Sequence, residues 1–466
     1  MYGKLIPIFS SHSKRKMDIL LLILFNLIFF WKIWLNPFTI SRSELLSTFY
    51  PSWLYIGRQA RKCQSWKTEP CFWLNFHAHP VLSSYYPPHV LTAWIASFLD
   101  LDTAFVLLTR TILVHFIWMS FGWYFLLSQS YTSIPLLIFG AITLSYSGYT
   151  IKQQPCIIYT IAWFPWILLG IAIHQPFVAG AALGMSLLAG YYPIGIQMLL
   201  ISFAASVVWI SPISWVPIGL LLGLPQLIPF LKYLPKTIRM EKNKKADVGF
   251  WEKAWFPGIT TLLLIPFSTS RIWPILILSV LLVSGLFSKY LPRISYRWLF
   301  TVQFCLGWMA VSGLANINTS SKVMLALLFI QGFDLYWHNS KLIPTLPYAE
   351  LPKRPSLAFK TQITTFLESN LKPHERVSGL PYPLFTGIVN SIKTLGYCGG
   401  MQLKLMAKWR GDENPNGSGC HDWFKLREDD ESLDRARVRF AFTSKKLNWR
   451  LTPFPRLYEN PRLSCG

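Results

Sequence analysis

From residue 17 to about residue 337, the chain consists mostly of apolar stretches that are long enough to cross a membrane. The hydrocarbon core of a bilayer is about 30 Å thick and requires about 20 apolar residues per helix. Only 14% of the 466 residues are charged, whereas a soluble protein of this size carries roughly a quarter. The mean hydropathy is +0.35. The sequence therefore predicts an all-α polytopic transmembrane bundle.

The apolar stretches predict about eleven spans. Their ranges are 17–38, 103–128, 133–150, 156–173, 177–191, 194–210, 214–233, 258–270, 273–288, 298–313 and 320–338. Lys14, Arg15 and Lys16 precede the first span, so the positive-inside rule places residues 1–16 in the cytoplasm. The first apolar run is longer than a signal-peptide core, and no small-x-small cleavage site follows it. We expect a retained anchor.

Three further regions complete the predicted organisation. The transmembrane domain, 17–340, contains a large outer loop at 41–91, which is dense in Trp, Tyr, His and Pro. A Pro-rich and amphipathic connector covers 341–379. Residues 380–466 are polar, with a strand pattern at 438–444, and predict a small α+β domain. An odd number of spans places this C-terminal domain outside the cytoplasm.

The basic segment 232–245 conflicts with the positive-inside rule, because eleven spans also place it outside. A basic outer loop beside a site for anionic lipid explains this, and so does a wrong span count. The formal net charge of +23 suggests lipid headgroups and lipid phosphates as partners. No nucleic-acid motif accompanies the charge, so we expect no nucleic-acid partner.

Glu44 is the acid of the outer loop that directly follows the first span. A carboxylate at a membrane surface can act as the general base for an acceptor hydroxyl. The structural alternative is a favourable charge at a helix N-terminus. Asp100 and Asp102 precede the second span. We expect Asp102 to cap that helix, and a second catalytic acid is the alternative.

His77 and His79 form a His-Ala-His pair, whose side chains project to one side of an extended segment. They could contact a substrate or phosphate, hold a metal, or act as interfacial hydrogen-bonding groups. Arg110 lies inside the second span, where it either binds a lipid phosphate or snorkels to the surface. His115 is expected to form an interhelical hydrogen bond. Asp334, near the end of the last span, is expected to be structural.

Lys232, Lys236 and Arg239 follow a helix end and could clamp a phosphate or pyrophosphate. The alternative is that they are solvated loop charges. Cys63 and Cys71 share the outer loop and form either a disulfide or two free thiols. The chain has no P-loop, G-x-S-x-G, H-E-x-x-H or Rossmann pattern in a suitable context. This argues against ATP-driven transport and common hydrolase chemistry.

Several motifs in a fixed order resemble the YfhO-like family of bacterial membrane proteins, which belongs with the GT-C type glycosyltransferases. In the outer loop they are Glu44 with LLSTFYP, WLNF at 73–76 and YPP at 86–88. The others are His115, GWY at 122–124, LSYSG at 144–148, AWFPWIL at 162–168, LLAGYYPIGIQ at 187–197, LPQLIPFLKYLPKTIR at 224–239, FDLYWHN at 333–339, ESNLKPHERV at 368–377, GYCGG at 396–400 and LYENP at 457–461. The chain is shorter than typical members, and Glu44 stands where the family has Asp.

The resemblance implies transfer of a sugar from a polyprenyl-phosphate-linked donor to an envelope glycan or glycolipid acceptor. The reaction would occur at the outer face of a bacterial cytoplasmic membrane. Glu44 would be the base, and His77, His79, Arg110, Lys232, Lys236 and Arg239 would bind substrate. No residue is assigned to a metal, and a requirement for a divalent metal stays open. A flippase or transporter for a lipid-linked precursor, and a catalytically degenerate scaffold, are the alternatives.

Overall fold

The computed structural model of the chain describes residues 12–39, 45, 49–62, 78–239, 257–269, 272–283, 298–317, 320–340, 362–372, 375–378, 394–395, 401–403, 437–442, 450–453 and 457–459. The chain forms two compact units. The bundle unit comprises Met1–Ile40, Thr109–Pro225 and Asn243–Thr345, and the loop unit comprises Ser41–Leu108, Gln226–Lys242 and Leu346–Gly466. The boundaries fall within the helices α5 (Leu101–Leu127) and α12 (Trp215–Tyr233).

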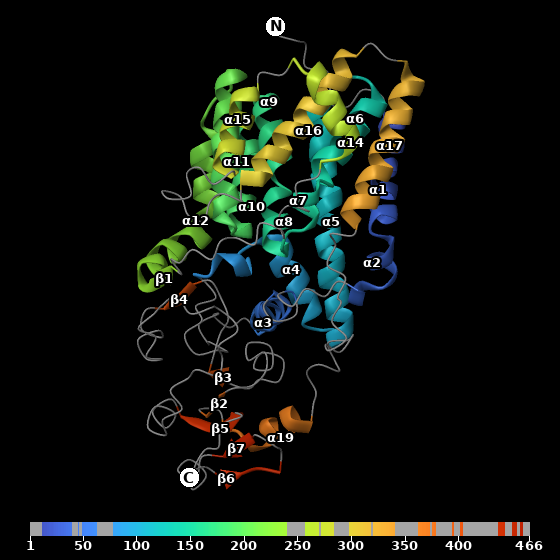
Figure 1. Cartoon of the computed structure of the whole chain (residues 1–466). Helices are drawn as coiled ribbons and strands as arrows, with labels where there is room; N and C mark the ends of the chain where they lie inside the picture. The colour runs from blue at the N-terminus through green and yellow to red at the C-terminus, as the bar shows by residue number, and fades with distance from the viewer. Residues whose placement is uncertain are drawn as a thin grey trace. The chain divides into compact units, whose positions relative to one another are not determined.

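The bundle unit is built from helices (Figure 1). Besides parts of α5 and α12, it contains α1 (His12–Phe29), α2 (Trp31–Leu35), η1 (Pro37–Thr39), α6 (Ile134–Ser145), α7 (Gly148–Ile151), α8 (Pro155–Ile161), α9 (Phe164–Ala172), α10 (Pro176–Ala189), α11 (Tyr192–Val208), α14 (Ile259–Leu264), η5 (Ile265–Phe267), α15 (Trp273–Val283), α16 (Leu299–Asn316) and α17 (Ser321–Asn339). Proline occupies the first or second position of α6 and of α8 to α11, where its missing N–H breaks no helical bond.

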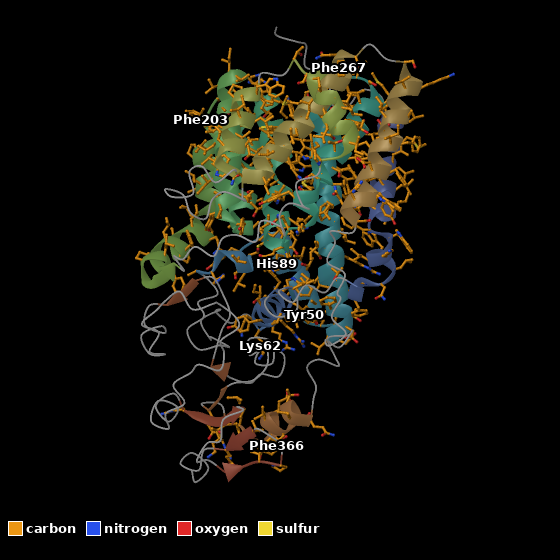
Figure 2. The ribbon with its side chains drawn as sticks, viewed as in Figure 1. Tyr50, Lys62, His89, Phe203, Phe267 and Phe366 are labelled. Atoms are coloured by element: carbon orange, nitrogen blue, oxygen red, sulfur yellow. The ribbon has the colours of Figure 1, made fainter. Side chains whose placement is uncertain are left out.

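A helix overlaps each of the eleven ranges that the sequence predicts as spans. Four described helical segments are long and apolar enough to cross a membrane: α5, α8 with α9, α12 and α16. The predicted helical bundle is therefore confirmed, while the number of crossings stays a prediction. Many large apolar side chains of the bundle unit are exposed, among them Phe203 and Phe267 (Figure 2). Such a surface suits contact with lipid.

Small residues allow close helix packing inside the bundle unit. Gly180 and Gly184 on α10 face α12 so closely that an added Cβ would lie 2.6 Å from Ile218 and 2.5 Å from Leu222. Glycines four residues apart let helix backbones approach each other, as is common in membrane helices.

The loop unit contains α3 (Tyr50–Arg61), η3 (Pro80–Leu82), α4 (Pro87–Ala96), η4 (Leu234–Lys236) and α19 (Gln362–Asn370). The described part of the predicted outer loop thus contains short helices. Two short strands, β1 (Thr237–Arg239) and β4 (Met401–Leu403), pair antiparallel with Ile238 opposite Gln402.

A five-stranded sheet forms near the end of the chain, in the order β3-β2-β5-β7-β6. Its strands are β2 (Arg376–Ser378), β3 (Thr394–Leu395), β5 (Val438–Phe442), β6 (Arg450–Leu451) and β7 (Leu457–Glu459). β2 runs parallel to β3 and β5, and β7 runs antiparallel to β5 and β6. β5 confirms the strand predicted at 438–444. Because β2 belongs to this sheet, the folded part begins inside the range predicted as a connector, 341–379.

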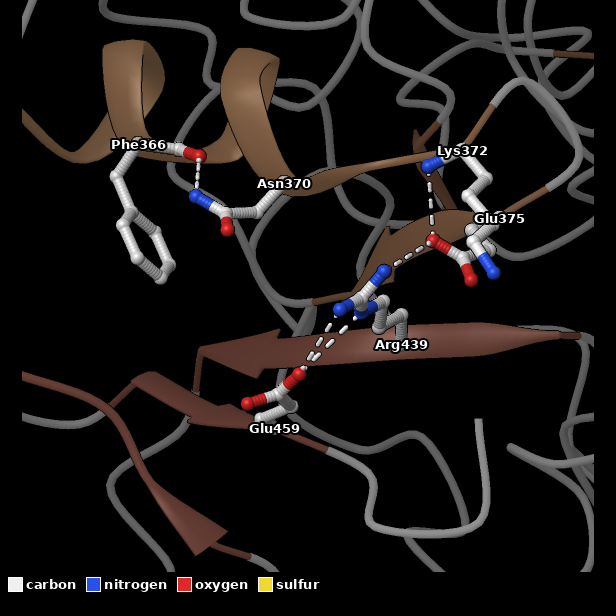
Figure 3. Close-up of polar contacts among 6 residues, drawn as sticks. All are labelled: Phe366, Asn370, Lys372, Glu375, Arg439 and Glu459. Carbon is white, nitrogen blue, oxygen red and sulfur yellow. Dashed lines mark hydrogen bonds and ion pairs between the residues drawn. The ribbon is translucent and has the colours of Figure 1, made fainter. Parts of the chain in front are cut away.

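Side chains of α19 and the sheet share a small core made of Leu367, Val377, Phe440 and Leu457. Beside it, the Arg439 guanidinium bridges Glu375 and Glu459, with nitrogen–oxygen distances of 3.1 Å to each (Figure 3). Burial lowers the pKa of Arg439, but hydrogen bonds to both carboxylates outweigh this and raise it overall. The ion pairs therefore link β5 and β7 to the residue that directly precedes β2.

Candidate functional site

The helices α3 and α4 of the loop unit pack side by side in parallel. The indole N–H of Trp53 donates to the carbonyl oxygen of His89 at 3.1 Å. Two turns further along both helices, Arg61 Nη1 donates to the carbonyl oxygen of Ser97 at 3.1 Å. The start of α3 thus lies beside the start of α4, and the ends lie together. We call this arrangement the α3–α4 pair.

Close approach of the two backbones occurs at Gly57, midway along α3. A Cβ added there would lie 2.0 Å from the carbonyl oxygen of Ala93 and 2.5 Å from its carbon. Only glycine fits against the α4 backbone at this point, because the atoms that a side chain would meet belong to the main chain. The close packing of the α3–α4 pair therefore depends on one glycine.

The first turn of α3 is attached to the start of α5 within the loop unit. The Tyr50 hydroxyl donates to the carbonyl oxygen of Leu101, and its ring contacts Phe105 edge-on at 5.2 Å. Burial raises the pKa of Tyr50, and the charge of Asp102 adds to this. Tyr50 therefore stays protonated and serves as a hydrogen-bond donor at neutral pH.

The helix α5 is capped by Asp100. Its carboxylate accepts from the backbone N–H groups of Asp102 and Thr103, each at 3.0 Å. The prediction that Asp102 is the cap is therefore wrong, because Asp102 already lies in the first turn and Asp100 directly precedes it. Hydrogen bonds from the side chain and backbone of Thr103 lower the pKa of Asp100. A catalytic role for Asp100 as a proton acceptor is thereby disfavoured.

His79 is buried, with 3% of its surface exposed. Burial lowers the pKa of His79 to about 4, so the ring is neutral at neutral pH. A neutral imidazole can donate and accept one hydrogen bond each, but it carries no charge to attract a phosphate. Its predicted partner His77 lies outside the described residues, so the structure leaves their pairing as a prediction.

Sequence reasoning missed His89, which is also only 3% exposed. Its ring lies 6.4 Å from that of Trp53, and Figure 2 marks His89 on α4 and Tyr50 on α3. The sequence signal for His89 is its place in YPPHV, two residues after Pro87, the first residue of α4. On α3, the Ser52 hydroxyl is buried and has no hydrogen-bond partner in the described part of the chain.

Sequence reasoning also missed cations at the C-terminal end of α3. Burial lowers the pKa of Arg58, while the neighbouring Tyr50 raises it. Arg61 lies over the ring of Phe98 at 4.6 Å, and Lys62 is exposed. Their positive charges suit a helix C-terminus, and they add to the basic character of the loop unit.

The other predicted site residues are distributed as follows. Glu44 lies outside the described residues, within the range 41–108 of the loop unit. Lys232 is exposed in the last turn of α12, Lys236 belongs to η4 and Arg239 to β1, all in the loop unit. Arg110 is exposed on α5 and falls in the bundle unit, so it does not share a unit with the rest.

Two ionisable groups of the bundle unit have structural roles. His115 Nδ1 lies 2.7 Å from the carbonyl oxygen of Thr111 in its own helix, and its ring lies 4.3 Å from that of Tyr159 on α8. This bond lies within α5, and the interhelical hydrogen bond of His115 stays a prediction. Asp334 accepts from the backbone N–H of Ile259 at the start of α14, as its predicted structural role requires.

In the described ranges, no three His, Cys, Asp or Glu residues are grouped so that they could hold a metal ion. Cys156 and Cys305 are buried free thiols, whereas Cys63 and Cys71 lie outside the described residues. Comparison with known proteins finds no protein family, no curated protein and no solved structure that matches the chain.

Proposed function

We propose that the chain is a membrane glycosyltransferase. It would move a sugar from a polyprenyl-phosphate-linked donor to a cell-envelope acceptor at the outer face of a bacterial cytoplasmic membrane. The proposal rests on the resemblance to the YfhO-like family and on one structural observation. The loop unit gathers three segments that are far apart in the sequence, 41–108, 226–242 and 346–466.

This grouping agrees with the predicted topology. Six predicted spans separate the first segment from the second, and four separate the second from the third. Even numbers of crossings return the chain to the same side of the membrane each time. The segment with Glu44 and the segment with Lys232, Lys236 and Arg239 would then face the same compartment. The pairing of β1 with β4 supports a common side for the basic segment and the C-terminal region.

The proposed reaction divides its work between these segments. The Glu44 carboxylate removes the proton from an acceptor hydroxyl, whose oxygen forms a new bond to the anomeric carbon of the donor sugar. The bond between that carbon and the lipid phosphate oxygen breaks. Lys232, Lys236 and Arg239 stabilise the negative charge on the departing polyprenyl phosphate. The neutral His79 ring would hydrogen-bond a substrate hydroxyl without adding charge.

The test uses purified protein in liposomes with a radiolabelled polyprenyl-phosphate hexose and an envelope extract as acceptor. Glu44→Gln should lower transfer by roughly 10²–10⁴-fold, since Gln cannot accept the proton. Glu44→Asp, which restores the acid typical of the family, should retain much more activity. Glu368→Gln is the matched control, because Glu368 is an exposed carboxylate of α19, and it should have no effect.

A transporter is the second candidate, favoured by the interrupted helices α6, α7 and α8 inside the bundle unit. Discontinuous helices are frequent at the substrate sites of transporters. The same liposomes separate the two functions. Movement of the hexose lipid across the bilayer without transfer to the acceptor would indicate a transporter. Neither movement nor transfer by the wild-type protein, with envelopes unchanged in lipid-linked sugars when the protein is lost, would indicate a scaffold.

A further inference from the structure

One side of α4 is exposed and apolar, although another side already packs against α3. Ala93 is buried, and its backbone lies against Gly57 of α3. Large apolar side chains are exposed along α4 at spacings of three and four residues, which place them on one face of the helix. We call them the outer face of α4: Leu91, Trp94, Ile95 and Phe98, the last of these in the turn that follows the helix. A helix that faces water carries polar residues on that side, so this face suits a partner other than water.

The hydroxyl groups beside the outer face are satisfied by the α4 backbone itself. The Thr92 hydroxyl donates to the carbonyl oxygen of Pro88 at 2.8 Å, and the Ser97 hydroxyl donates to that of Trp94 at 2.7 Å. In lipid, polar groups must be satisfied within the protein, and a bond to a carbonyl three or four residues earlier does this for Ser and Thr. The indole of Trp94 belongs to the type of side chain that is enriched at the lipid–water boundary.

Two cations lie at the edge of the outer face. Arg61 is the last residue of α3 and Lys62 is its C-cap, and both are exposed (Figure 2 labels Lys62). The Arg61 guanidinium lies 4.6 Å from the centre of the Phe98 ring, and its Nη1 donates to the carbonyl oxygen of Ser97. A guanidinium has five N–H donors, so others are available to phosphate oxygens. The nearby carboxylate of Asp100 accepts from the first turn of α5 instead.

The length and position of α4 suit the surface of a membrane. Its 10 residues correspond to about 15 Å at 1.5 Å per residue, about half of the hydrocarbon thickness. Residues 97–100 separate it from α5, which is long enough to cross a membrane. A helix that enters a bilayer brings the segment just before it to the bilayer surface. Trp, Phe and Leu side chains with Lys and Arg beside them are typical of helices that lie in this interface.

We propose that the outer face of α4 is inserted into the interfacial layer of a membrane leaflet, where Arg61 and Lys62 bind the phosphates of anionic lipid headgroups. The apolar side chains then contact acyl chains, and the α3–α4 pair is attached to the membrane surface. A second copy of the chain is another occupant for such a face, but a net charge of +23 favours an anionic partner over a like-charged copy. The inference does not depend on the proposed function, since it concerns only the attachment of the loop unit to lipid.

The test identifies what touches the outer face. The purified full-length protein carries the change Phe98→p-benzoylphenylalanine, a photoreactive residue, in nanodiscs of equal parts phosphatidylcholine and phosphatidylglycerol. After irradiation, mass spectrometry should find lipid adducts at this position. The same residue at Leu91, which is 58% exposed, repeats the test where the Phe98 contact with Arg61 is kept. The matched control places it at Glu368 on α19, whose exposed residues are all polar, and should give no lipid adducts.

Headgroup recognition is read from the same adducts. Phosphatidylglycerol should exceed phosphatidylcholine by roughly five- to thirtyfold, the effect of one to two basic groups near an anionic surface. Adding Lys62→Glu should bring the ratio close to one, because the new carboxylate offsets Arg61. Adding Lys62→Arg should keep the enrichment. Lys62 is exposed, so neither change disturbs the packing of α3.

Three results would overturn the inference. Adducts between two copies of the chain at positions 98 and 91 would show that the outer face is a dimer interface. Lipid adducts no more frequent than at position 368 would show that the face lies in water. An adduct ratio that is the same in Lys62→Glu and in Lys62→Arg would show that the cations do not select the headgroup. Loss of sugar transfer with all lipid adducts retained would refute the glycosyltransferase and keep the inference.

Discussion

Replacing Gly57 by alanine should separate the α3–α4 pair. The added Cβ would lie 2.0 Å from the Ala93 carbonyl oxygen, whereas ordinary contacts begin at 3.4 Å, so the helices are 1.4 Å too close (3.4 minus 2.0). Since the opposing atom belongs to the α4 backbone, a rotamer change cannot relieve the overlap. The whole of α4 must shift, and the hydrogen bond from Trp53 to His89 shifts with it.

The magnitude follows from three terms. Overpacking costs about 1–3 kcal/mol, and a lost hydrogen bond between the helices costs about 1 kcal/mol. Alanine offsets this by about 1 kcal/mol, because it favours a helix more than glycine does. We expect Gly57→Ala to destabilise the protein by about 1–3 kcal/mol and to expose the α3 region to protease.

The control is Gly195→Ala on α11, where the nearest atom to the added Cβ is Leu187 Cδ2 at 3.9 Å. It should be neutral or stabilise by up to about 1 kcal/mol. Both variants are measured by thermal unfolding in detergent and by limited proteolysis with cleavage sites mapped by mass spectrometry. If Gly57→Ala matches the wild type in both assays, the close parallel packing of α3 on α4 is wrong.

Three further predictions concern single side chains. Arg439→Met should destabilise the C-terminal sheet by about 3–5 kcal/mol, because it leaves the buried Glu375 carboxylate without its cation. Glu459→Gln should cost less, because Glu459 is more exposed than Glu375. Limited proteolysis measures both variants, and equal cleavage of the two would contradict this prediction. The pKa of His79 is about 4 in the folded protein and 6.5 in the unfolded chain. The neutral, buried ring therefore contributes stability that is present above pH 6.5 and is lost as the pH falls toward 4. His79→Gln should flatten that part of the stability–pH curve by up to about 3 kcal/mol, and an unchanged curve would refute the burial argument. Asp334→Leu should lower stability by about 1–2 kcal/mol, since the first N–H of α14 loses its cap, and a thermal midpoint equal to the wild type would exclude this role.

The helices of the bundle unit could be predicted because their cause is local. Every backbone group in an apolar run must pair within the run, and proline at a first position marks where such a helix starts. A helix accordingly overlaps each predicted range, and β5 follows from the alternation of apolar residues in VRFAF. The function and the roles of the site residues stay predictions from the resemblance.

Other features depend on contacts that no local pattern contains. The choice of Asp100 over Asp102 as the cap depends on where α5 begins, and a shift of two residues changes it. β2 pairs with β5, which lies some 60 residues further along the chain. No local pattern reveals this pairing, so the sequence predicted a connector over the range 341–379. Helix boundaries and strand partners of this kind are decided by packing.

The sequence by itself determined that this chain forms a helical bundle with apolar surfaces, since hydropathy and proline positions act over a few residues. Tertiary structure decided how α3 lies parallel to α4, why Gly57 is required there, and which histidines are enclosed. It also decided that the chain stops being helical at Tyr146, where Asn339 and Gln303 supply the hydrogen bonds that the helix no longer makes. Those partners lie more than 150 residues away along the chain, so only the folded arrangement brings them together.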